Sequence, residues 1–401
     1  MQNRDVLISG ASIAGPALAY WLYQRGFRPT VVERAPAPRP GGQTVDLRGA
    51  GRTVIERMNL METVRSLCLD QAGIGFVDGN GRVRARMAAD LFGGEGFVSE
   101  IEILRGDLGQ VLYNATATST EYLFDDTITA LEQDDDGVTV SFESAPTRRF
   151  GLVIGADGLH SITRQLAFGP EAGFVRPMDC YTSWFTTPAV VDLDGWYLMH
   201  NAPGGLVVSI RPGRCVDEAK AALSFRSPPI AYDRRDIPSQ QAIVAERFVG
   251  VGWEADRLVA AMPAAPDFFF DSYGQVRMPS WTRGRVGLVG DAGYCPTPLT
   301  GLGTSLALVG AYVLAGELGA IDDHRAAFER YEAVMRPYVE RSQKLPPGGI
   351  SGYAPRSSAH IKARIATMGW MTRWPLRSMM ANQFAKAGDI ALPDYEEPAL
   401  R

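Results

Sequence analysis

The chain has 401 residues, 46% of them hydrophobic and 21% charged, and a formal net charge of −5, which suits a folded protein of two or three domains. The acidic balance and the lack of a basic stripe argue against a nucleic-acid partner. The 4 cysteines and 4 histidines are scattered without metal-ligand spacing, so we expect no metal site and no disulfide framework, only reduced and buried thiols.

The N-terminal stretch DVLISGASIAGPALAYWLYQRGFRPTVVERA reads as strand, turn, helix and strand. Residues 6–9 are apolar at nearly every position, as a buried parallel strand is. The turn runs from Gly10 to Gly15, and apolar residues then recur at helical spacing. Residues 29–32 predict a second strand that ends at Glu33. This order is typical of a unit that binds the ADP part of a dinucleotide.

Each small or acidic residue of this unit has a physical role. Gly10 permits a tight turn, Ser12 is small enough for the backbone to approach a pyrophosphate, and Gly15 lets the helix pack close to the strand. Free N–H groups at the helix start then face the phosphates. Glu33, 18 residues beyond Gly15, can bind ribose hydroxyls and disfavours a 2′-phosphate, which favours FAD or NAD over NADP. The predicted contacts here are Gly10, Ser12, Ile13, Ala14, Gly15, Glu33 and Arg34.

Two later segments favour FAD over NAD. Leu152–Gly155 predicts another buried strand, which Asp157 and Gly158 follow. The segment GRVGLVGDAG predicts a strand with Asp291 at its tip, and a long apolar helix is expected to begin near Gly303. A carboxylate can hold the hydroxyls of a ribityl chain, and a helix N-terminus stabilises the negative charge of a reduced flavin ring.

These segments together resemble the FAD-dependent aromatic monooxygenases of the p-hydroxybenzoate hydroxylase type, also called class A flavoprotein monooxygenases. The glycine turn with Glu33, the segment GADGLHSITR and the segment GLVGDAGYCPTPLTGLG are similar to the family's three fingerprints. EILRGDLGQVL is similar to a family helix that offers an arginine to the cofactor. Within the family, GGQTVDLRGAG and AALSFRSP are most similar to tetracycline-inactivating and antibiotic-tailoring enzymes. The further FAD contacts expected are Arg105, Asp157, Gly158, Asp291, Pro298, Gly301, Leu302 and Gly303.

The chain departs from the family pattern at three positions of the last fingerprint. Tyr294 stands where the family usually has histidine, Leu302 where it has glutamine and Ser305 where it has asparagine. None of these changes removes a backbone contact, so the resemblance still implies FAD binding, with altered surroundings at the flavin edge.

The expected fold class is α/β, with a discontinuous Rossmann-like FAD-binding domain, a β-sheet substrate domain and C-terminal helices. The FAD-binding domain is predicted from residues 1–72, 98–170 and 272–330, the sheet domain from 73–97 and 171–271, and the helical segment from 331–401. Asn80-Gly81 predicts the turn of a hairpin. Strand-like runs are predicted at residues 206–210, 221–225 and 247–251.

The resemblance implies that NADH or NADPH reduces FAD transiently and that O2 then forms a flavin C4a-hydroperoxide. The expected substrate, which this species would hydroxylate, is a polycyclic aromatic or enolic small molecule. The chemistry belongs to the flavin, so no catalytic nucleophile or triad is expected. The substrate-contact candidates are Met199, His200, Arg211, Pro298 and Thr300.

Other readings stay open at this point. The chain could be a flavoprotein that does not hydroxylate, either a reductase or a protein that sequesters a ligand. A plain NAD-dependent dehydrogenase has no need of Asp157 and Asp291. The charged start RDVLISG leads directly into a strand, so we expect a cytoplasmic monomer or weak homodimer with no membrane association.

Overall fold

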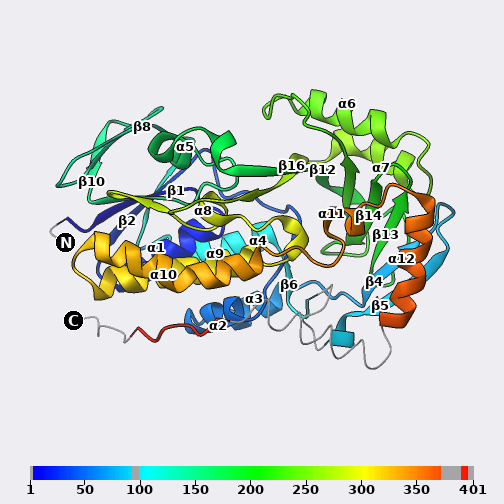
Figure 1. The fold of residues 1–401 in the computed structure, drawn as a ribbon, viewed down its shortest axis with the longest axis horizontal. Helices are drawn as coiled ribbons and strands as arrows, with labels where there is room; N and C mark the ends of the chain where they lie inside the picture. The colour runs from blue at the N-terminus through cyan, green and yellow to red at the C-terminus, as the bar shows by residue number, and fades with distance from the viewer. Residues whose placement is uncertain (1–2, 93–98, 372–389, 396–401) are drawn as a thin grey trace.

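The computed structural model describes residues 3–92, 99–371 and 390–395. Two sheet-based regions lie side by side along the long axis, and the chain passes between them several times (Figure 1). Short 3-10 helices punctuate the connections: η1 (Ala89–Phe92), η2 (Glu171–Gly173), η3 (Met262–Ala264) and η4 (Pro298–Thr300).

The first region is built on a six-stranded sheet with the order β17-β18-β11-β1-β2-β7. Its strands are β1 (Asp5–Ser9), β2 (Arg28–Glu33), β7 (Glu121–Phe124), β11 (Leu152–Gly155), β17 (Thr282–Arg283) and β18 (Val286–Leu288). All neighbours pair in parallel except β17 and β18. The central strands are apolar and fully buried because both faces of the sheet are covered.

Helices cover one face of this sheet. They are α1 (Ala14–Gln24), α2 (Ala50–Arg57), α3 (Met61–Ser66), α4 (Arg105–Asn114), α9 (Gly303–Ala320) and α10 (His324–Ser342). The helix α9 is long and apolar enough to span a membrane, but 83% of it is buried. It packs against α1, α2 and α10, so it is the central helix of the core.

The other face carries a three-stranded antiparallel sheet and one short helix. The strands β8 (Ile128–Gln133), β9 (Val138–Phe142) and β10 (Arg148–Phe150) bring Val138, Val140 and Phe150 against Leu7 and Val153 of the main sheet. The helix on this face is α5 (Ile162–Phe168), which follows β11, whereas α8 (Asp291–Tyr294) follows β18 and packs in the core of the helical face. A two-stranded ladder of β3 (Thr44–Asp46) and β6 (Glu102–Leu104) lies between the two regions of the fold (Figure 1).

The second region is a seven-stranded sheet with the order β16-β12-β15-β14-β13-β4-β5. Its strands are β4 (Gly73–Val77), β5 (Val83–Ala88), β12 (Val175–Pro188), β13 (Trp196–Ala202), β14 (Leu206–Pro212), β15 (Glu218–Arg226) and β16 (Phe269–Val276). The helices α6 (Ile237–Phe248) and α7 (Ala255–Ala261) cover one face. On the other face lie α11 (Gly349–Tyr353) and α12 (Ser358–Met371).

The fold agrees with the predicted α/β class, and the hairpin at Asn80-Gly81 is the antiparallel pair β4–β5. The strand predicted at residues 247–251 is wrong. Gln240, Val244 and Phe248 are buried at helical spacing, so the apolar run is the end of α6.

Two other predictions differ in part from the structure. The predicted limit between residues 330 and 331 falls inside α10, which is continuous, and residues 372–389 and 396–401 of the predicted helical segment lie outside the described residues. The four cysteines are free, but Cys215 is exposed and Cys68 half-buried, so the prediction of buried thiols is wrong for these two.

Candidate FAD-binding and substrate site

The glycine turn after β1 has no room for side chains. Gly10 has φ +107°, and a Cβ there would lie 2.6 Å from the Ala156 carbonyl oxygen. A Cβ on Gly15 would lie 1.9 Å from the Gly10 carbonyl oxygen. The turn delivers the chain into α1, whose N-cap residue Ile13 makes no side-chain capping bond. The first N–H groups of α1 are therefore available to an anion.

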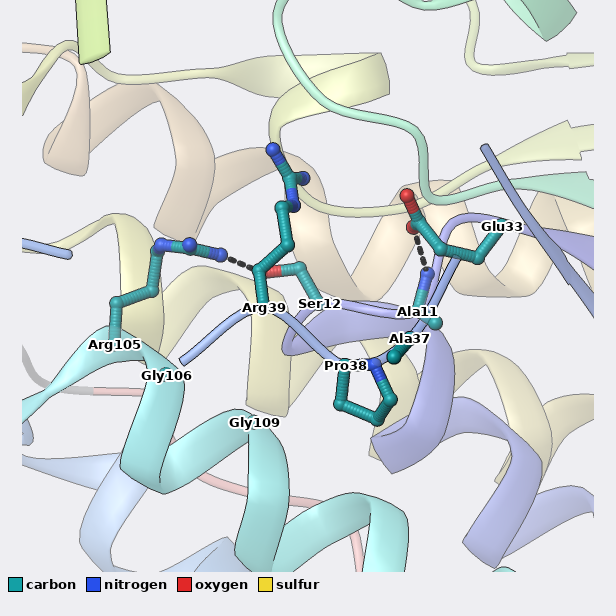
Figure 2. Close-up of a pocket in the computed structure, with 9 residues that line it drawn as sticks. All are labelled: Ala11, Ser12, Glu33, Ala37, Pro38, Arg39, Arg105, Gly106 and Gly109. Carbon is teal, nitrogen blue, oxygen red and sulfur yellow. Dashed lines mark hydrogen bonds between the residues drawn. The ribbon is translucent and has the colours of Figure 1, made fainter. Parts of the chain in front are cut away.

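Glu33 ends β2 beside this turn. Its carboxylate accepts hydrogen bonds from the N–H of Ala11 at 2.8 Å and of Ala35 at 2.9 Å. These two bonds fix the acid at the strand end, where β1 and β2 run in parallel. Figure 2 shows Glu33 meeting the turn from one side and Arg105 from the other.

Arg105 is the first residue of α4, and its Nη1 donates to Ser12 Oγ at 3.0 Å. Desolvation and the neighbouring Arg39 lower the pKa of Arg105 to about 10, so it remains charged at neutral pH. The surrounding pocket is lined by Ala11, Ser12, Glu33, Ala37, Pro38, Arg39, Arg105, Gly106 and Gly109 (Figure 2). Sequence reasoning missed Arg39; a basic residue in the proline-rich loop after Glu33 was the available signal. The predicted Arg34 is exposed, and the pocket does not include it.

Asp157 follows β11 and is engaged within its own loop. Its carboxylate accepts hydrogen bonds from Ser161 Oγ, from the N–H and Oγ1 of Thr163, and at 3.4 Å from Ser9 Oγ. The acid thereby links β1 to the start of α5. Gly158, with φ +82°, has no neighbouring atom within 4 Å of a Cβ position. A direct contact from Asp157 or Gly158 to a nucleotide stays a prediction.

Arg164 is fully buried beside this loop. It donates to the carbonyl oxygens of Ala292 at 2.9 Å and Leu159 at 2.6 Å. Through Ala292 it ties α5 to the segment that carries Asp291, so it positions one predicted FAD-binding segment against another.

Asp291 begins α8 at the tip of β18. Its side chain is exposed, whereas Ala292, Gly293 and Tyr294 are buried. Although the side chain is accessible, the surrounding protein partly desolvates the carboxylate and raises its pKa. Gly303 is near: its Cβ position would lie 3.8 Å from Asp291 Oδ1, with no closer contact. An accessible acid thus lies beside the start of α9.

The start of α9 resembles that of α1. Its N-cap residue Leu302 makes no side-chain capping bond, and Gly301 before it adopts the left-handed conformation with φ +65°. Pro298 is exposed and Thr300 half-buried, so both border open space at this turn. The first N–H groups of this 18-residue helix are available to an acceptor, as an anionic flavin edge would require.

These groups fit FAD. An acid at the end of β2 suits the ribose, the uncapped α1 with Arg105 suits the pyrophosphate, accessible Asp291 suits the ribityl hydroxyls, and the uncapped α9 suits the ring edge. The fit rests mainly on backbone groups.

The three departures from the family pattern lie in the core. Tyr294 is fully buried, accepts a hydrogen bond from Tyr331 at 2.9 Å and packs on Trp281. Leu302 is buried, and Ser305 Oγ donates to the Arg48 carbonyl oxygen at 2.8 Å. These side chains therefore adjust the packing around α9 and leave its N–H groups unchanged.

Met199 and His200 occupy opposite faces of the seven-stranded sheet, because successive strand residues alternate. Met199 clusters with Tyr197 and Val207 on the face that carries α11. His200 instead bonds the Val77 carbonyl oxygen at 3.1 Å on the α6 and α7 face. The structure therefore does not bring His200 together with Met199, and a substrate contact from His200 stays a prediction.

Arg211 lies on the same face as Met199. Its guanidinium stacks on the ring of Tyr197, 3.8 Å from the centroid. Nη1 donates to Thr44 Oγ1 at 2.7 Å and to Glu102 Oε2 at 3.1 Å, so Arg211 links β14 to the ladder β3–β6. The helix α11 on this face contacts η4, which precedes the start of α9. Arg211 and Met199 therefore share the sheet face on which α11 connects to η4, and η4 contains Pro298 and Thr300. We refer to this region between the sheet and the α9 turn as the substrate zone.

Sequence reasoning missed the charged residues that accompany Arg211. Glu102 is 1% exposed, and Asp46 and Arg48 form an ion pair of 2.8 Å next to it. Desolvation and the proximity of Asp46 raise the pKa of Glu102 to about 8. Among the residues that the structure describes, three or more His, Cys, Asp or Glu side chains nowhere gather as a metal site would need.

Comparison with known proteins agrees with this geometry. The family model described as "FAD binding domain" matches residues 3–344. A Mycobacterium tuberculosis protein named only as uncharacterized is 46% identical over 354 residues, which cover 88% of this chain and 95% of that protein. A "Flavin-dependent monooxygenase" of an unknown prokaryotic organism is 43% identical over 341 residues, 85% of this chain and 88% of that protein. The crystal structure of tetracycline destructase Tet(55) has a TM-score of 0.81 and 38% identity and covers 98% of this chain and 99% of its own.

Proposed function

Since the chain belongs to the FAD-binding domain family and is an FAD-dependent monooxygenase, we propose that it hydroxylates a polycyclic phenol or enol with NADH or NADPH and O2. The substrate class is supported by the likeness to Tet(55), whose name states that it destroys tetracycline. The observation that carries the proposal is Arg211, a cation laid on an aromatic ring in the zone between the sheet and the α9 turn. Such a pair suits a flat, acidic substrate.

When bound, FAD supplies the chemistry: it accepts a hydride from the nicotinamide and transfers one oxygen atom of O2. The residues of this chain bind and orient. We propose that Glu33 and the α1 start hold the adenosine diphosphate with Arg105, and that Asp291 holds the ribityl chain. The uncapped N–H groups of α9 stabilise negative charge at the ring edge.

The remaining predicted residues shape the space for the substrate. Met199 and Tyr197 are buried in the apolar cluster that supports Arg211, and Pro298 and Thr300 border the α9 turn. Arg211 donates to an oxygen of the substrate and so fixes its orientation. The helices α6 and α7 cover the opposite face of the sheet and exclude water from that face.

The setting of the enzyme is also part of the proposal. Four free cysteines suit a reducing compartment, so we propose a cytoplasmic location. We further propose a monomer or weak homodimer that acts on small molecules, without a nucleic-acid or membrane partner.

Turnover under ¹⁸O-labelled O2 tests the proposed function. The FAD-loaded protein is given NADPH or NADH and a panel of polycyclic phenols and enols, tetracycline included, and the products are weighed by mass spectrometry. We expect one labelled oxygen atom in the product of at least one panel member. Nucleotide oxidation that yields only hydrogen peroxide with every compound would contradict the proposal and favour the non-hydroxylating alternative.

A further inference from the structure

A buried pair of carboxyl groups lies where the two regions of the fold meet. Asp46 of β3 and Glu102 of β6 are direct partners in the antiparallel register. Side chains at such positions are roughly 5 Å apart, and like charges there repel each other. Glu102 has 1% of its side chain exposed and Asp46 has 15%, so water screens the repulsion poorly.

Each carboxyl group forms an ion pair with an arginine. Arg48 pairs with Asp46 at 2.8 Å, and Arg211 pairs with Glu102 at 3.1 Å through Oε2. Glu102 Oε1 is buried and has no hydrogen-bond partner within the described parts of the chain. An unpartnered carboxyl oxygen beside a second carboxyl group is the natural place for a proton.

The other ionisable groups near Glu102 do not remove the need for a proton on the carboxyl pair. Tyr197 lies beneath Arg211. Cys68, just beyond α3, is near enough to interact electrostatically with Glu102, and burial raises the pKa of its thiol, which disfavours the thiolate. In the segment just before β6, Glu100 is half exposed and pairs with Arg52 and Arg65. Desolvation raises the pKa of Glu102 well above that of a free glutamate, which agrees with the geometry.

A shared proton leaves Arg211 only partly compensated by its ion-pair partner. Glu102 then carries at most part of one negative charge, which it shares with Asp46, the residue that pairs with Arg48. Arg48 is 8% exposed, whereas 25% of the Arg211 side chain is exposed, on the same sheet face as Met199. The uncompensated charge is therefore accessible at Arg211.

We propose that Asp46 and Glu102 share one proton at neutral pH and thereby keep the charge of Arg211 available to an anionic oxygen of the substrate, a phenolate, enolate or carboxylate. The assignment of that anion as substrate rests on the proposed function; the shared proton does not. Loss of the proton would let Glu102 neutralise Arg211, and the site would then disfavour an anion. Asp46 and Glu102 are thus positioning residues that act through Arg211.

Infrared spectroscopy of the FAD-loaded enzyme tests the shared proton without any substrate. A protonated carboxyl group has a carbonyl band that disappears on ionisation. We expect such a band in the wild type to disappear as the pH rises through about 8. It should be missing from Glu102→Gln and unchanged in Glu100→Gln, whose side chain is half exposed. A wild type with no titrating band, or a band that persists in Glu102→Gln, would overturn the proposal.

Asp46→Asn gives a second readout should Glu102→Gln fail to fold. Removing the neighbouring negative charge should move the titration of the same band to lower pH. An unmoved titration would show that the two carboxyl groups do not share a proton.

Benzoate, a simple aromatic carboxylate, tests the charge at Arg211. We expect it to raise the thermal midpoint of the FAD-loaded wild type near about pH 6 and to lose this effect near about pH 9.5. In Glu102→Gln the stabilisation should persist at both pH values, and in Arg211→Met it should vanish at both. No stabilisation of the wild type at the lower pH, or equal stabilisation of Arg211→Met, would overturn the role of the charge. A failed ¹⁸O experiment with an intact infrared band would instead count against the proposed function alone.

Discussion

The proposed FAD cleft and the proposed substrate zone are built by different means. The cleft uses backbone: two helix starts without capping side chains, α1 and α9, and glycines that leave no room for a Cβ. The substrate zone uses side chains: Met199 and Arg211 from adjacent strands of the sheet, with Glu102 from a separate ladder.

The difference explains what each part tolerates. A backbone-built site survives the exchange of neighbouring side chains, as Tyr294 and Ser305 illustrate, but it does not survive an added Cβ at Gly15. A side-chain-built zone changes its chemistry with every substitution, which suits a family that acts on many substrates. The predictions below test this contrast, from the largest expected effect to the smallest.

Gly15→Ala should have the largest effect, because the new Cβ would lie 1.9 Å from the Gly10 carbonyl oxygen, a backbone atom that cannot move aside. We expect FAD affinity to fall at least ~100-fold, about 2.7 kcal/mol. Equilibrium dialysis of FAD against the purified variant measures this. Gly173→Ala is the matched control, since no atom lies within 4 Å of its Cβ position. Equal FAD affinity in Gly15→Ala and the wild type would refute a backbone-built cleft.

Arg105→Met removes the main side-chain contribution to the same cleft. A charge-assisted hydrogen bond to a phosphate contributes about 1.5–3 kcal/mol, so FAD affinity should fall roughly 10- to 100-fold. The same dialysis measures it, with exposed Arg214→Met as control. A loss larger than that of Gly15→Ala would reverse the ranking of backbone and side chains.

Tyr294→His restores the residue that the family usually carries. Tyr294 is buried and bonded to Tyr331, so the change should lower the free energy of unfolding by about 1–3 kcal/mol. FAD affinity should stay within about threefold of the wild type. Denaturant unfolding and FAD dialysis on one preparation separate the two effects. A large gain in FAD affinity with unchanged stability would place Tyr294 in the cleft after all.

His160 bridges the two regions and should give the smallest effect. It pairs with Glu171 and with Asp271 of β16, each at 3.0 Å. These acids raise the pKa of His160 although burial opposes them, so its stabilisation is complete below about pH 6.5 and disappears as the pH rises through the folded pKa. At Glu171, desolvation opposes the shift, but the hydrogen bond and charge of His160 lower the pKa to about 2. The stabilisation that Glu171 contributes is therefore complete above about pH 4.5 and falls as the pH approaches 2.

The bridge should therefore be strongest between about pH 4.5 and 6.5. We expect His160→Gln to lower the free energy of unfolding in that window by less than about 1 kcal/mol, because the pair is partly exposed. Denaturant unfolding of both proteins across the pH range measures the difference. If the difference in unfolding free energy between wild type and His160→Gln grew toward pH 9, the predicted pH dependence of the bridge would be contradicted.

Features of the proposed cleft are easier to predict from the sequence than those of the proposed substrate zone, for a physical reason. A glycine turn, an acid at a strand end and a helix start are local, so Gly10, Gly15 and Glu33 could be assigned from spacing alone. The zone depends on register: Met199 and His200 are adjacent, and only the pairing of β13 decides which of them faces the α9 turn.

The ladder β3–β6 shows the same limit. It places Asp46 opposite Glu102, although the two residues are far apart in the sequence, and no local sequence pattern predicts that pair. For Tyr294 the sequence predicts altered surroundings at the flavin edge, because it does not show that the side chain points into the core.

The central claim is that substrate binds on the face of the sheet that carries Arg211 and not on the face that carries His200. The direct test is to titrate FAD-loaded wild type, Arg211→Met and His200→Gln with the best substrate of the panel. The change in flavin absorbance reports binding and gives Kd. We predict that Arg211→Met raises Kd at least ~10-fold, about 1.4 kcal/mol, while His200→Gln leaves it unchanged. An unchanged Kd in Arg211→Met with a raised Kd in His200→Gln would contradict the account.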